Sequence, residues 1–345
     1  MYDYIIITHI PNFYKVNLYN ELSKKFKILV IFTAKNTKEK RSDDFITLVD
    51  ARFDYKVLFD GQYEERNVFK NIISINKIFK KFKYKRILVS GWDTKEDWFS
   101  VLSNSKEKNC LALESTINDS TVSGIKGLIK RLFLSRISAT FASGSLHRSL
   151  LEKLNYKGKV VITKGVGIIN KPKFNFIKKN YKKRFLFIGR LSKEKNIDIL
   201  INLFNNLNDY KLTIIGTGPL GQELRNNAQK NIIFKGVISN QNLKEHFEVN
   251  DIILLPSISE TWGLVVEEAL YFGMPAIVND NCGVSELIKC GVNGYILNFR
   301  NIESVKNVIL SIDNKTYQSL LKGVSEFSLS NKDIDQVNSY DISKN

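Results

Sequence analysis

The chain has 345 residues and a mass of 39.7 kDa, about twice the usual domain of ~100–200 residues, so two domains are expected. Hydrophobic residues make up 43% of the chain and aromatic residues 11%, which excludes a disordered or low-complexity protein. The 52 Lys and Arg residues outnumber the 35 Asp and Glu residues, and the net charge of +17 favours an anionic partner such as nucleic acid, an acidic lipid surface or a phosphorylated small molecule.

The predicted elements of the first half are short apolar strands that alternate with amphipathic helices. The strands are expected at 4–8, 27–32, 86–90, 110–114, 139–142 and 159–163, and helices at 13–25 and 124–135. The chain opens with the strand-like MYDYIIIT, and no uninterrupted apolar run approaches ~18 residues. A cytoplasmic protein, or one peripheral to the inner face of a membrane, is therefore expected.

The second half repeats this alternation more regularly. Strands are expected at 184–188, 211–215, 232–234, 251–255 and 276–279, and helices at 197–207, 220–229, 241–247, 264–272 and 284–289. Strands that alternate with helices predict parallel sheets covered on both faces, with ligands bound beyond the carboxyl ends of the strands. The predicted fold class is therefore α/β, with two Rossmann-like, doubly wound domains facing a cleft.

The charge distribution suggests where the domains divide. Residues 1–183 contain 36 basic and 17 acidic residues, net +19, whereas residues 184–345 contain 16 and 18, net −2. We expect an N-terminal domain at 1–168, a basic linker at 169–183 and a C-terminal domain at 184–316. Residues 317–345 are expected to return to the N-terminal domain.

Metal and disulfide sites are not expected. The three Cys residues have no CxxC spacing and do not pair with the three His residues in a ligand-like pattern. The D-x-D sequence at 333–335 lies in a polar stretch away from any predicted strand end.

A glycine motif follows the predicted strand at 211–215. The sequence IIGTGPLG at 214–221 fits G-x-G-x-x-G at a strand-to-helix turn, which is typical of dinucleotide binding. The acidic ribose ligand that such a site needs after the next strand is missing, because Lys235 and Gly236 stand there. A structural turn is the favoured interpretation, and a site for NAD(P) built on Gly216–Gly221 is the alternative.

The most informative segment is LPSISETWGLVVEEAL at 255–270. A buried strand ends at Pro256, and a helix beginning near Gly263 would offer the free N–H groups of Gly263, Leu264 and Val265 to an anion. Glu260 and Glu268 bracket this helix end, which suits a ligand with hydroxyl groups on both sides of a diphosphate, a nucleotide sugar. Each Glu alone could equally be a capping or surface residue.

This segment resembles the E-x7-E signature of retaining GT-B glycosyltransferases of family 4, with Glu260 and Glu268 in its acidic positions and Glu267 outside the spacing. Further similar segments follow the family's order over about 110 residues. They are FIGRLSKEKN at 187–196, GTGP at 216–219, FKGV at 234–237, NCGVSELI at 281–288 and GVNG at 291–294.

The resemblance implies a donor site without a metal or another cofactor. Arg190, after the predicted strand that ends at Gly189, and Lys195 would neutralise the departing diphosphate, since Arg offers a bidentate fork and Lys a point charge. Glu260 would hold the sugar hydroxyls and Glu268 the ribose. The expected UDP- or GDP-sugar site is completed by six further residues: Gly189, Val237, Thr261, Gly263, Leu264 and Val265.

The acceptor side is less well matched. The family often has a Gly-rich loop where this chain has His9, and commonly a His where this chain has Glu114 at a predicted strand end. Both residues are candidate acceptor contacts, and both could equally serve structural roles.

The basic surplus includes two candidate membrane-binding helices. Residues 68–86 contain seven basic residues and no acidic one, interleaved with aromatic residues and isoleucines, and residues 127–136 form a second such segment. Either could instead pack an apolar face on the sheet. No recognised nucleic-acid-binding motif accompanies the charge.

Together these features predict a metal-independent, retaining hexosyltransferase-type enzyme. Its acceptor would be a lipid-linked saccharide. The reaction would be a step in the synthesis of a bacterial surface polysaccharide (capsule, O-antigen or exopolysaccharide). The alternatives are an NAD(P)-dependent oxidoreductase and a non-catalytic polyanion-binding protein.

Overall fold

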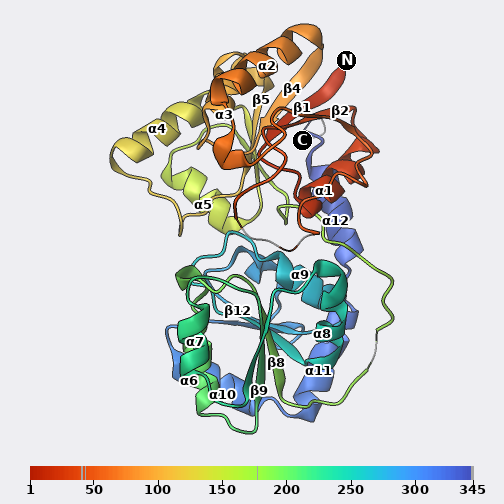
Figure 1. Ribbon diagram of the computed structural model, residues 1–345, viewed down its shortest axis with the longest axis vertical. Helices are drawn as coiled ribbons and strands as arrows, with labels where there is room; N and C mark the ends of the chain where they lie inside the picture. Colours follow the sequence, from red (N-terminus) through yellow and green to blue (C-terminus); the bar gives the residue numbers. More distant parts are fainter. Residues whose placement is uncertain (40–41, 43, 177, 343–345) are drawn as a thin grey trace. The chain divides into compact units, whose positions relative to one another are not determined.

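The computed structural model describes residues 1–39, 42, 44–176 and 178–342, and these residues form two compact α/β units (Figure 1). Unit 1 contains the described residues of 1–41, 45–168 and 332–345, and unit 2 those of 42–44 and 169–331. Each unit is built on its own parallel sheet. Among the described residues, no helix combines the length and apolarity needed to cross a bilayer.

Unit 1 has a seven-stranded sheet in the order β3-β2-β1-β4-β5-β6-β7, with every pair parallel. The strands are β1 (Tyr2–Thr8), β2 (Ile28–Phe32), β3 (Asp54–Val57), β4 (Tyr84–Val89), β5 (Asn109–Leu113), β6 (Ala139–Ala142) and β7 (Lys159–Ile162). The helices are α1 (Phe13–Ser23), α2 (Val68–Lys81), α3 (Lys95–Leu102), α4 (Gly124–Ser135) and α5 (Ser145–Lys153), with 3₁₀ turns η1 (Tyr63–Glu65) and η2 (Lys106–Lys108).

The core of unit 1 explains its apolar strands. Strand β2 is buried along its whole length, as expected for a strand covered on both faces. Tyr340 packs against this core. Its ring stacks on that of Phe141 with the centroids 4.4 Å apart, and the Tyr340 carbonyl accepts a hydrogen bond from the Tyr4 hydroxyl at 2.6 Å. Tyr340 follows helix α12 (Leu329–Ser339), whose residues from 332 onward belong to unit 1.

Unit 2 has a six-stranded parallel sheet in the order β10-β9-β8-β11-β12-β13. The strands are β8 (Arg184–Ile188), β9 (Lys211–Ile215), β10 (Ile232–Gly236), β11 (Ile252–Leu255), β12 (Ala276–Asn279) and β13 (Gly294–Leu297). The helices are α6 (Ile197–Asn205), α7 (Gly221–Asn227), α8 (Leu243–Val249), α9 (Leu264–Tyr271), α10 (Ile302–Ser311) and α11 (Asn314–Ser325), with 3₁₀ turns η3 (Lys193–Lys195), η4 (Asn240–Asn242) and η5 (Gly283–Leu287).

The strand order of each sheet reverses at one point. In unit 1 the reversal falls between β1 and β4, and in unit 2 between β8 and β11. The connections leave such neighbouring strands in opposite directions, so a crevice opens beyond their carboxyl ends. Residues that follow β8 and β11 therefore occupy the expected ligand position of unit 2.

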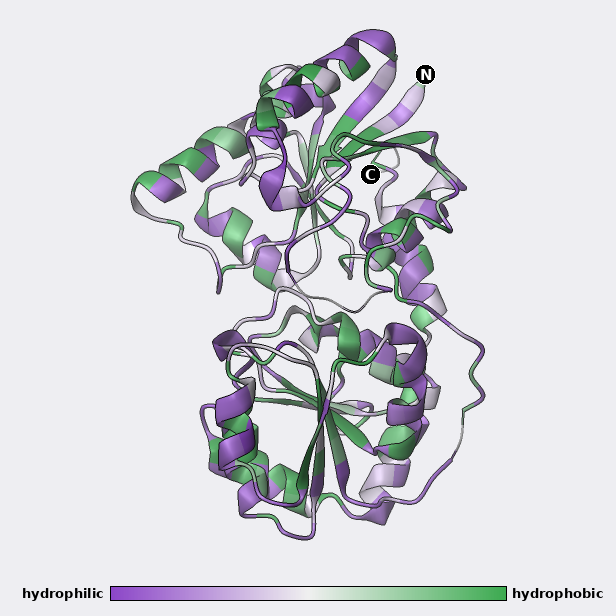
Figure 2. Cartoon of the chain, viewed as in Figure 1, coloured by the Kyte–Doolittle hydropathy of each residue, from purple (hydrophilic) through white to green (hydrophobic). Residues whose placement is uncertain are grey.

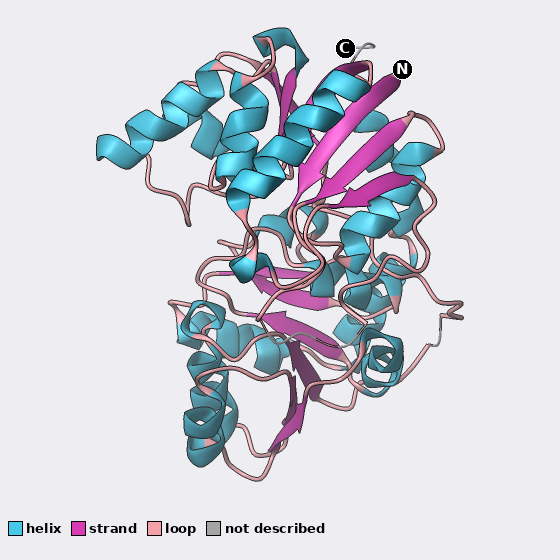
Figure 3. Cartoon of the chain, turned by 45° about the horizontal axis from the view of Figure 1, so that its top comes forward, coloured by secondary structure: helices cyan, strands magenta, loops and turns pink. Residues whose placement is uncertain are grey.

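The predicted α/β class with two doubly wound parallel sheets is confirmed, with helices beside both sheets and apolar residues concentrated on the strands (Figures 2 and 3). One predicted element is wrong: residues 283–287 form the 3₁₀ turn η5 where an α-helix was expected at 284–289. The expected segment 317–345 is divided, since α11 lies in unit 2 and the described residues from 332 lie in unit 1.

Candidate functional site

The loop after β8 carries the first group of predicted site residues. Gly189 directly follows the strand, and its N–H donates to the carbonyl of Ile215 on β9 at 3.0 Å. Arg190 is exposed beside it, and the turn η3 then brings Lys195 back toward the sheet. Asn196, in the left-handed conformation with φ 56°, ends this turn and donates its amide to the Pro256 carbonyl at 3.2 Å. The loop after β8 is thus fastened to the loop after β11.

The loop after β11 is held by the segment that follows β12. The N–H of Gly283 donates to the Glu260 carbonyl at 3.0 Å, and that of Val284 donates to the Trp262 carbonyl at 2.9 Å. A Cβ at Gly283 would lie 2.2 Å from the Thr261 carbonyl oxygen, so glycine is required for this close approach. Glu260 and Thr261 therefore sit on a backbone that is fixed from the neighbouring strand.

The structure brings Lys195 and Glu260 together. The Lys195 ammonium forms an ion pair with Oε2 of Glu260, and the two side chains are only 19% and 16% exposed. The Ser257 hydroxyl donates to the same carboxylate oxygen at 3.4 Å. Because one residue follows β8 and the other follows β11, the pair lies at the point where the sheet order reverses.

Helix α9 begins shortly after Glu260 in the sequence. Gly263, at φ 115°, is the residue that precedes it, and a Cβ there would meet Leu255 at 2.9 Å and Val284 at 3.0 Å. The first N–H groups of a helix lack partners inside it, so those of Leu264 and Val265 are available to an anion.

The adjacent glutamates of α9 differ in their surroundings. Glu267 is fully buried and accepts a hydrogen bond from the Trp262 indole, so it has a structural partner that the E-x7-E spacing did not reveal. Glu268 is partly exposed, and burial, followed by the charges of Glu267 and Asp44, raises its pKa to about 8. This raised pKa favours the protonated carboxyl group at neutral pH, which can donate as well as accept hydrogen bonds.

The glycine motif at 216–221 packs against the loop after β8. A Cβ at Gly216 would lie 1.9 Å from the Gly189 carbonyl oxygen, and one at Gly218 would lie 2.4 Å from that of Leu191. These close approaches explain why glycine is needed at both positions, and they agree with a structural turn. Val237 follows the edge strand β10, two strands from β8, and is 53% exposed.

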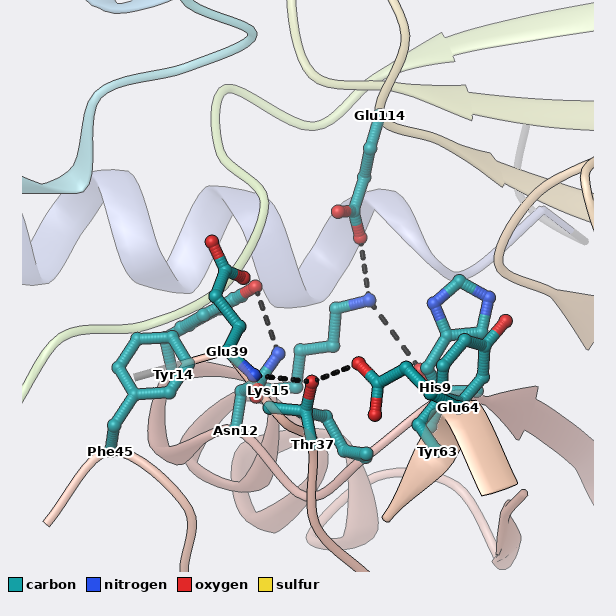
Figure 4. A pocket seen from close by; sticks show the side chains of 12 residues that line it. His9, Asn12, Tyr14, Lys15, Thr37, Glu39, Phe45, Tyr63, Glu64 and Glu114 are labelled. Carbon is teal, nitrogen blue, oxygen red and sulfur yellow. Dashed lines mark hydrogen bonds and ion pairs between the residues drawn. The ribbon is translucent and has the colours of Figure 1, made fainter. Parts of the chain in front are cut away.

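A pocket of about 320 Å³ opens at the strand ends of unit 1 (Figure 4). It contains both predicted acceptor-side residues, His9 after β1 and Glu114 after β5. Figure 4 shows Lys15 of α1 between them. The remaining lining residues are aromatic, hydroxyl-bearing, amide, acidic or apolar: Thr8, Ile10, Asn12, Tyr14, Thr37, Glu39, Phe45, Tyr63 and Glu64.

Lys15 is the residue of this pocket that sequence reasoning missed. Its ammonium lies 2.6 Å from Oε1 of Glu114 and 3.4 Å from the Thr8 hydroxyl, and its side chain is only 9% exposed. Burial opposes the charge of Lys15, but the carboxylate of Glu114 outweighs it and raises the pKa of Lys15. A helix-borne lysine ordinarily indicates a solvated surface, so no signal in the sequence pointed to this pair.

Two histidines lie near the same ion pair. Burial, and then the charge of Lys15, lowers the pKa of His9 to about 4, so its imidazole is neutral at neutral pH. Within the described part of the chain, Nε2 of His9 has no hydrogen-bond partner. His147 of α5 is fully buried close enough to Glu114 for their charges to interact, and burial lowers its pKa to about 4. Sequence reasoning gave His147 no role.

Within the part of the chain that the structure describes, no three His, Cys, Asp or Glu side chains gather into a group that could hold a metal ion.

Residues 169–320 match the family described as "Glycosyl transferases group 1". The matched segment holds Lys195, Glu260 and α9.

The chain is 31% identical over 196 residues to the "Uncharacterized 41.2 kDa protein in cps region" of Klebsiella pneumoniae, and the match covers 53% of this chain and 54% of that protein. It thus spans about half the length of that relative. In fold, it is similar to the lipopolysaccharide outer core galactosyltransferase WaaB, with a TM-score of 0.73, 14% identity and 99% of each chain covered. It is also similar to Anabaena Alr3699/HepE solved in complex with UDP, with a TM-score of 0.74, 13% identity and 99% of each chain covered.

Proposed function

We propose that this protein is a glycosyltransferase that transfers a sugar from a nucleoside-diphosphate donor to an acceptor hydroxyl group. The observation that carries this proposal is the Lys195–Glu260 pair, which lies at the strand-order reversal of unit 2 within the segment that matches the family. The pair supports the proposal because a cation and a carboxylate lie together at the edge where a parallel sheet binds its ligand.

The donor roles follow from the chemistry of each group. Arg190 and Lys195 neutralise the charge that grows on the diphosphate as the glycosidic bond breaks, and the N–H groups at the start of α9 add to this effect. Glu260 accepts hydrogen bonds from sugar hydroxyls, and the protonated Glu268 binds the ribose. Gly189, Thr261 and Val237 supply the surrounding backbone. Two cations and a helix end together supply the charge that a metal ion would otherwise provide, so metal-independent transfer is part of the proposal.

The acceptor roles fall on the pocket of unit 1. Tyr14, Phe45 and Tyr63 offer aromatic faces to sugar rings, and Glu114 accepts a hydrogen bond from an acceptor hydroxyl. The neutral imidazole of His9 can accept another.

The finer parts of the proposal come from the family resemblance and from the relatives. They are retention of anomeric configuration, a UDP- or GDP-linked donor, and a lipid-linked saccharide acceptor at an anionic membrane. A relative encoded in a cps region and a neighbour that acts on lipopolysaccharide support a role in surface polysaccharide synthesis.

The decisive experiment measures ligand-induced stabilisation with a panel of UDP, GDP, their sugars and NAD(P)H. A donor at 100 times its Kd should raise the free energy of unfolding by about 2.7 kcal/mol. Transfer would then be followed with the stabilising donor and extracted lipid-linked saccharides, and the anomeric configuration of the product read by NMR. Stabilisation by NAD(P)H alone would favour the oxidoreductase, and salt-sensitive polyanion binding without any nucleotide effect would favour the non-catalytic alternative.

A further inference from the structure

Helix α4 exposes an apolar stripe that no described residue of unit 1 covers. Its members recur at helical spacing: Ile125 (79% exposed), Leu128 (63%), Ile129 (46%) and Leu132 (60%). Figure 1 places α4 at the outer edge of unit 1, and Figure 2 shows hydrophobic residues along it. A contiguous exposed apolar surface on a soluble domain ordinarily marks an interaction site.

The opposite face of α4 is firmly attached, so the stripe belongs to a folded helix. Phe133 and Leu134 are buried, and the Phe133 ring contacts Trp98 with centroids 4.9 Å apart. Lys130 donates to the Thr121 carbonyl at 3.0 Å, and Arg131 donates to the Val122 carbonyl at 3.0 Å. These contacts hold the stripe in a fixed outward orientation.

The charge around the stripe indicates its partner. Residues 120–151 contain five basic residues and no acidic one. Lys126 is exposed beside Ile125 on α4, and Arg148 is exposed on α5. Large apolar side chains flanked by cations are the features of helices that lie in the headgroup region of an anionic bilayer. A second copy of the chain would bring another surplus of positive charge, and is disfavoured as the partner.

We propose that α4 is the membrane-docking element of this protein, with Ile125, Leu128, Ile129 and Leu132 entering an anionic lipid surface. The inference rests on the membrane location in the proposed function and assigns it to one helix. Of the two candidate segments in the sequence, it selects the one at 127–136, part of α4, rather than the one at 68–86. Helix α2 buries Ile75 and Ile78 and leaves Phe69 and Ile73 as its large exposed apolar residues.

The test is vesicle flotation with phosphatidylcholine vesicles, with and without phosphatidylglycerol, at low and high salt. We expect binding only to the anionic vesicles, and weaker binding at high salt. The double variant Leu128→Ser, Ile129→Ser should bind at least about tenfold more weakly, and Lys126→Gln about fivefold more weakly, the equivalent of about 1 kcal/mol per charge. The matched controls, Phe69→Ser with Ile73→Ser on α2 and Leu310→Ser on α10, should keep at least half of the binding. Thermal unfolding checks that each variant is folded.

Three results would overturn the inference: a wild-type protein that ignores anionic vesicles at low salt, a stripe variant that binds like the wild type, or loss of binding in the α2 variant alone. Sedimentation that shows a wild-type dimer and a monomeric stripe variant, with vesicle binding unchanged, would assign the stripe to a second copy instead. Nucleotide stabilisation is measured without vesicles, so failure of the proposed function leaves the docking result interpretable.

Discussion

Lys195 and Glu260 form an ion pair across the point where the sheet order of unit 2 reverses. The two residues lie in separate segments of the sequence, and the structure makes them partners, so the charge of Lys195 is balanced by Glu260. Under the proposed function, the donor diphosphate would take the cation while the sugar hydroxyls take the carboxylate. One side-chain rearrangement would then serve both halves of the ligand.

Replacing Lys195 should lower turnover strongly. We expect Lys195→Ala to reduce kcat about 10²-fold, because the cation stabilises charge that develops in the transition state. Lys193→Ala, on the same turn but exposed, should change kcat less than about twofold. Steady-state transfer rates for both variants provide the measurement. Equal losses would show that the effect belongs to the turn as a whole rather than to Lys195.

Arg190 should act on the leaving group more than on donor binding. We expect Arg190→Ala to lower kcat about 10²-fold with a smaller change in KM for the donor, since charge on the leaving oxygens grows as the bond breaks. The two constants are separated by varying donor concentration at saturating acceptor. A variant with normal kcat and a raised KM would assign Arg190 to ground-state binding alone.

Glu268 should make stability depend on pH. Its pKa of about 8 in the folded chain exceeds its ordinary value of 4.5, so between these pH values the folded state holds a proton that the unfolded state has released. The stabilising contribution is complete below the unfolded pKa and is lost as pH rises through about 8. Glu268→Gln should therefore become more stable than the wild type at high pH, by on the order of a few kcal/mol, since each unit of pKa corresponds to about 1.4 kcal/mol and solvent at the partly exposed side chain screens part of the effect.

Denaturant unfolding at pH 5 and pH 8.5 measures this difference for Glu268→Gln. Glu303→Gln, in the exposed first turn of α10, is the matched control for the substitution itself. Parallel pH profiles for wild type and Glu268→Gln would contradict the assignment.

The Lys15–Glu114 ion pair should contribute to the stability of unit 1. Lys15→Met leaves the carboxylate of Glu114 without its cation in a pocket, and we expect a loss of about 1–3 kcal/mol in the free energy of unfolding. The double variant Lys15→Met, Glu114→Gln should recover part of this loss because no unpaired charge remains. Urea unfolding of the single and double variants gives the coupling energy. Strictly additive losses would mean that the two side chains do not stabilise each other.

The glycine turn offers a steric test with its control in the same loop. A Cβ at Gly218 would overlap the Leu191 carbonyl, whereas one at Gly221 would make an ordinary 3.5 Å contact with the Leu191 side chain. Gly218→Ala should therefore destabilise the protein by about 2 kcal/mol or more, and Gly221→Ala by less than about 1 kcal/mol. Thermal unfolding without nucleotide measures both. A tolerated Gly218→Ala would remove the structural account of this glycine and return the motif to ligand binding.

The features that were predictable from the sequence are those with local signals. Apolar runs such as 28–32 are buried on both faces. The periodicity of the second half predicts every strand there except β13, and it predicts the helices α6 to α9 but not the later ones. Strand β3 was missed because its residues are mostly exposed and have no apolar pattern. Residues 284–289 have helix-like spacing, but the bonds of Gly283 and Val284 to the loop at 260–262 fix them in a tighter turn.

The site was predictable only in part, for the same reason. Glu260 and Lys195 each lie in a recognisable motif, although their ion pair depends on tertiary structure. Lys15 and Glu267 looked like ordinary surface residues, because nothing nearby in the sequence shows that Glu114 or Trp262 would be their partner. Burial of a charged side chain is decided by distant residues, which periodicity cannot reveal.

The placement of Tyr340 against Phe141 and Tyr4 has a consequence for biosynthesis. A ribosome delivers residues 1–168 first, but this packing cannot form until Tyr340 has emerged. The sheet and helices of unit 2 are continuous in sequence from 184 to 325 and therefore precede Tyr340 out of the exit tunnel. The first unit to be synthesised is therefore the last to be completed. A nascent chain arrested before residue 340 would present an open aromatic face to chaperones.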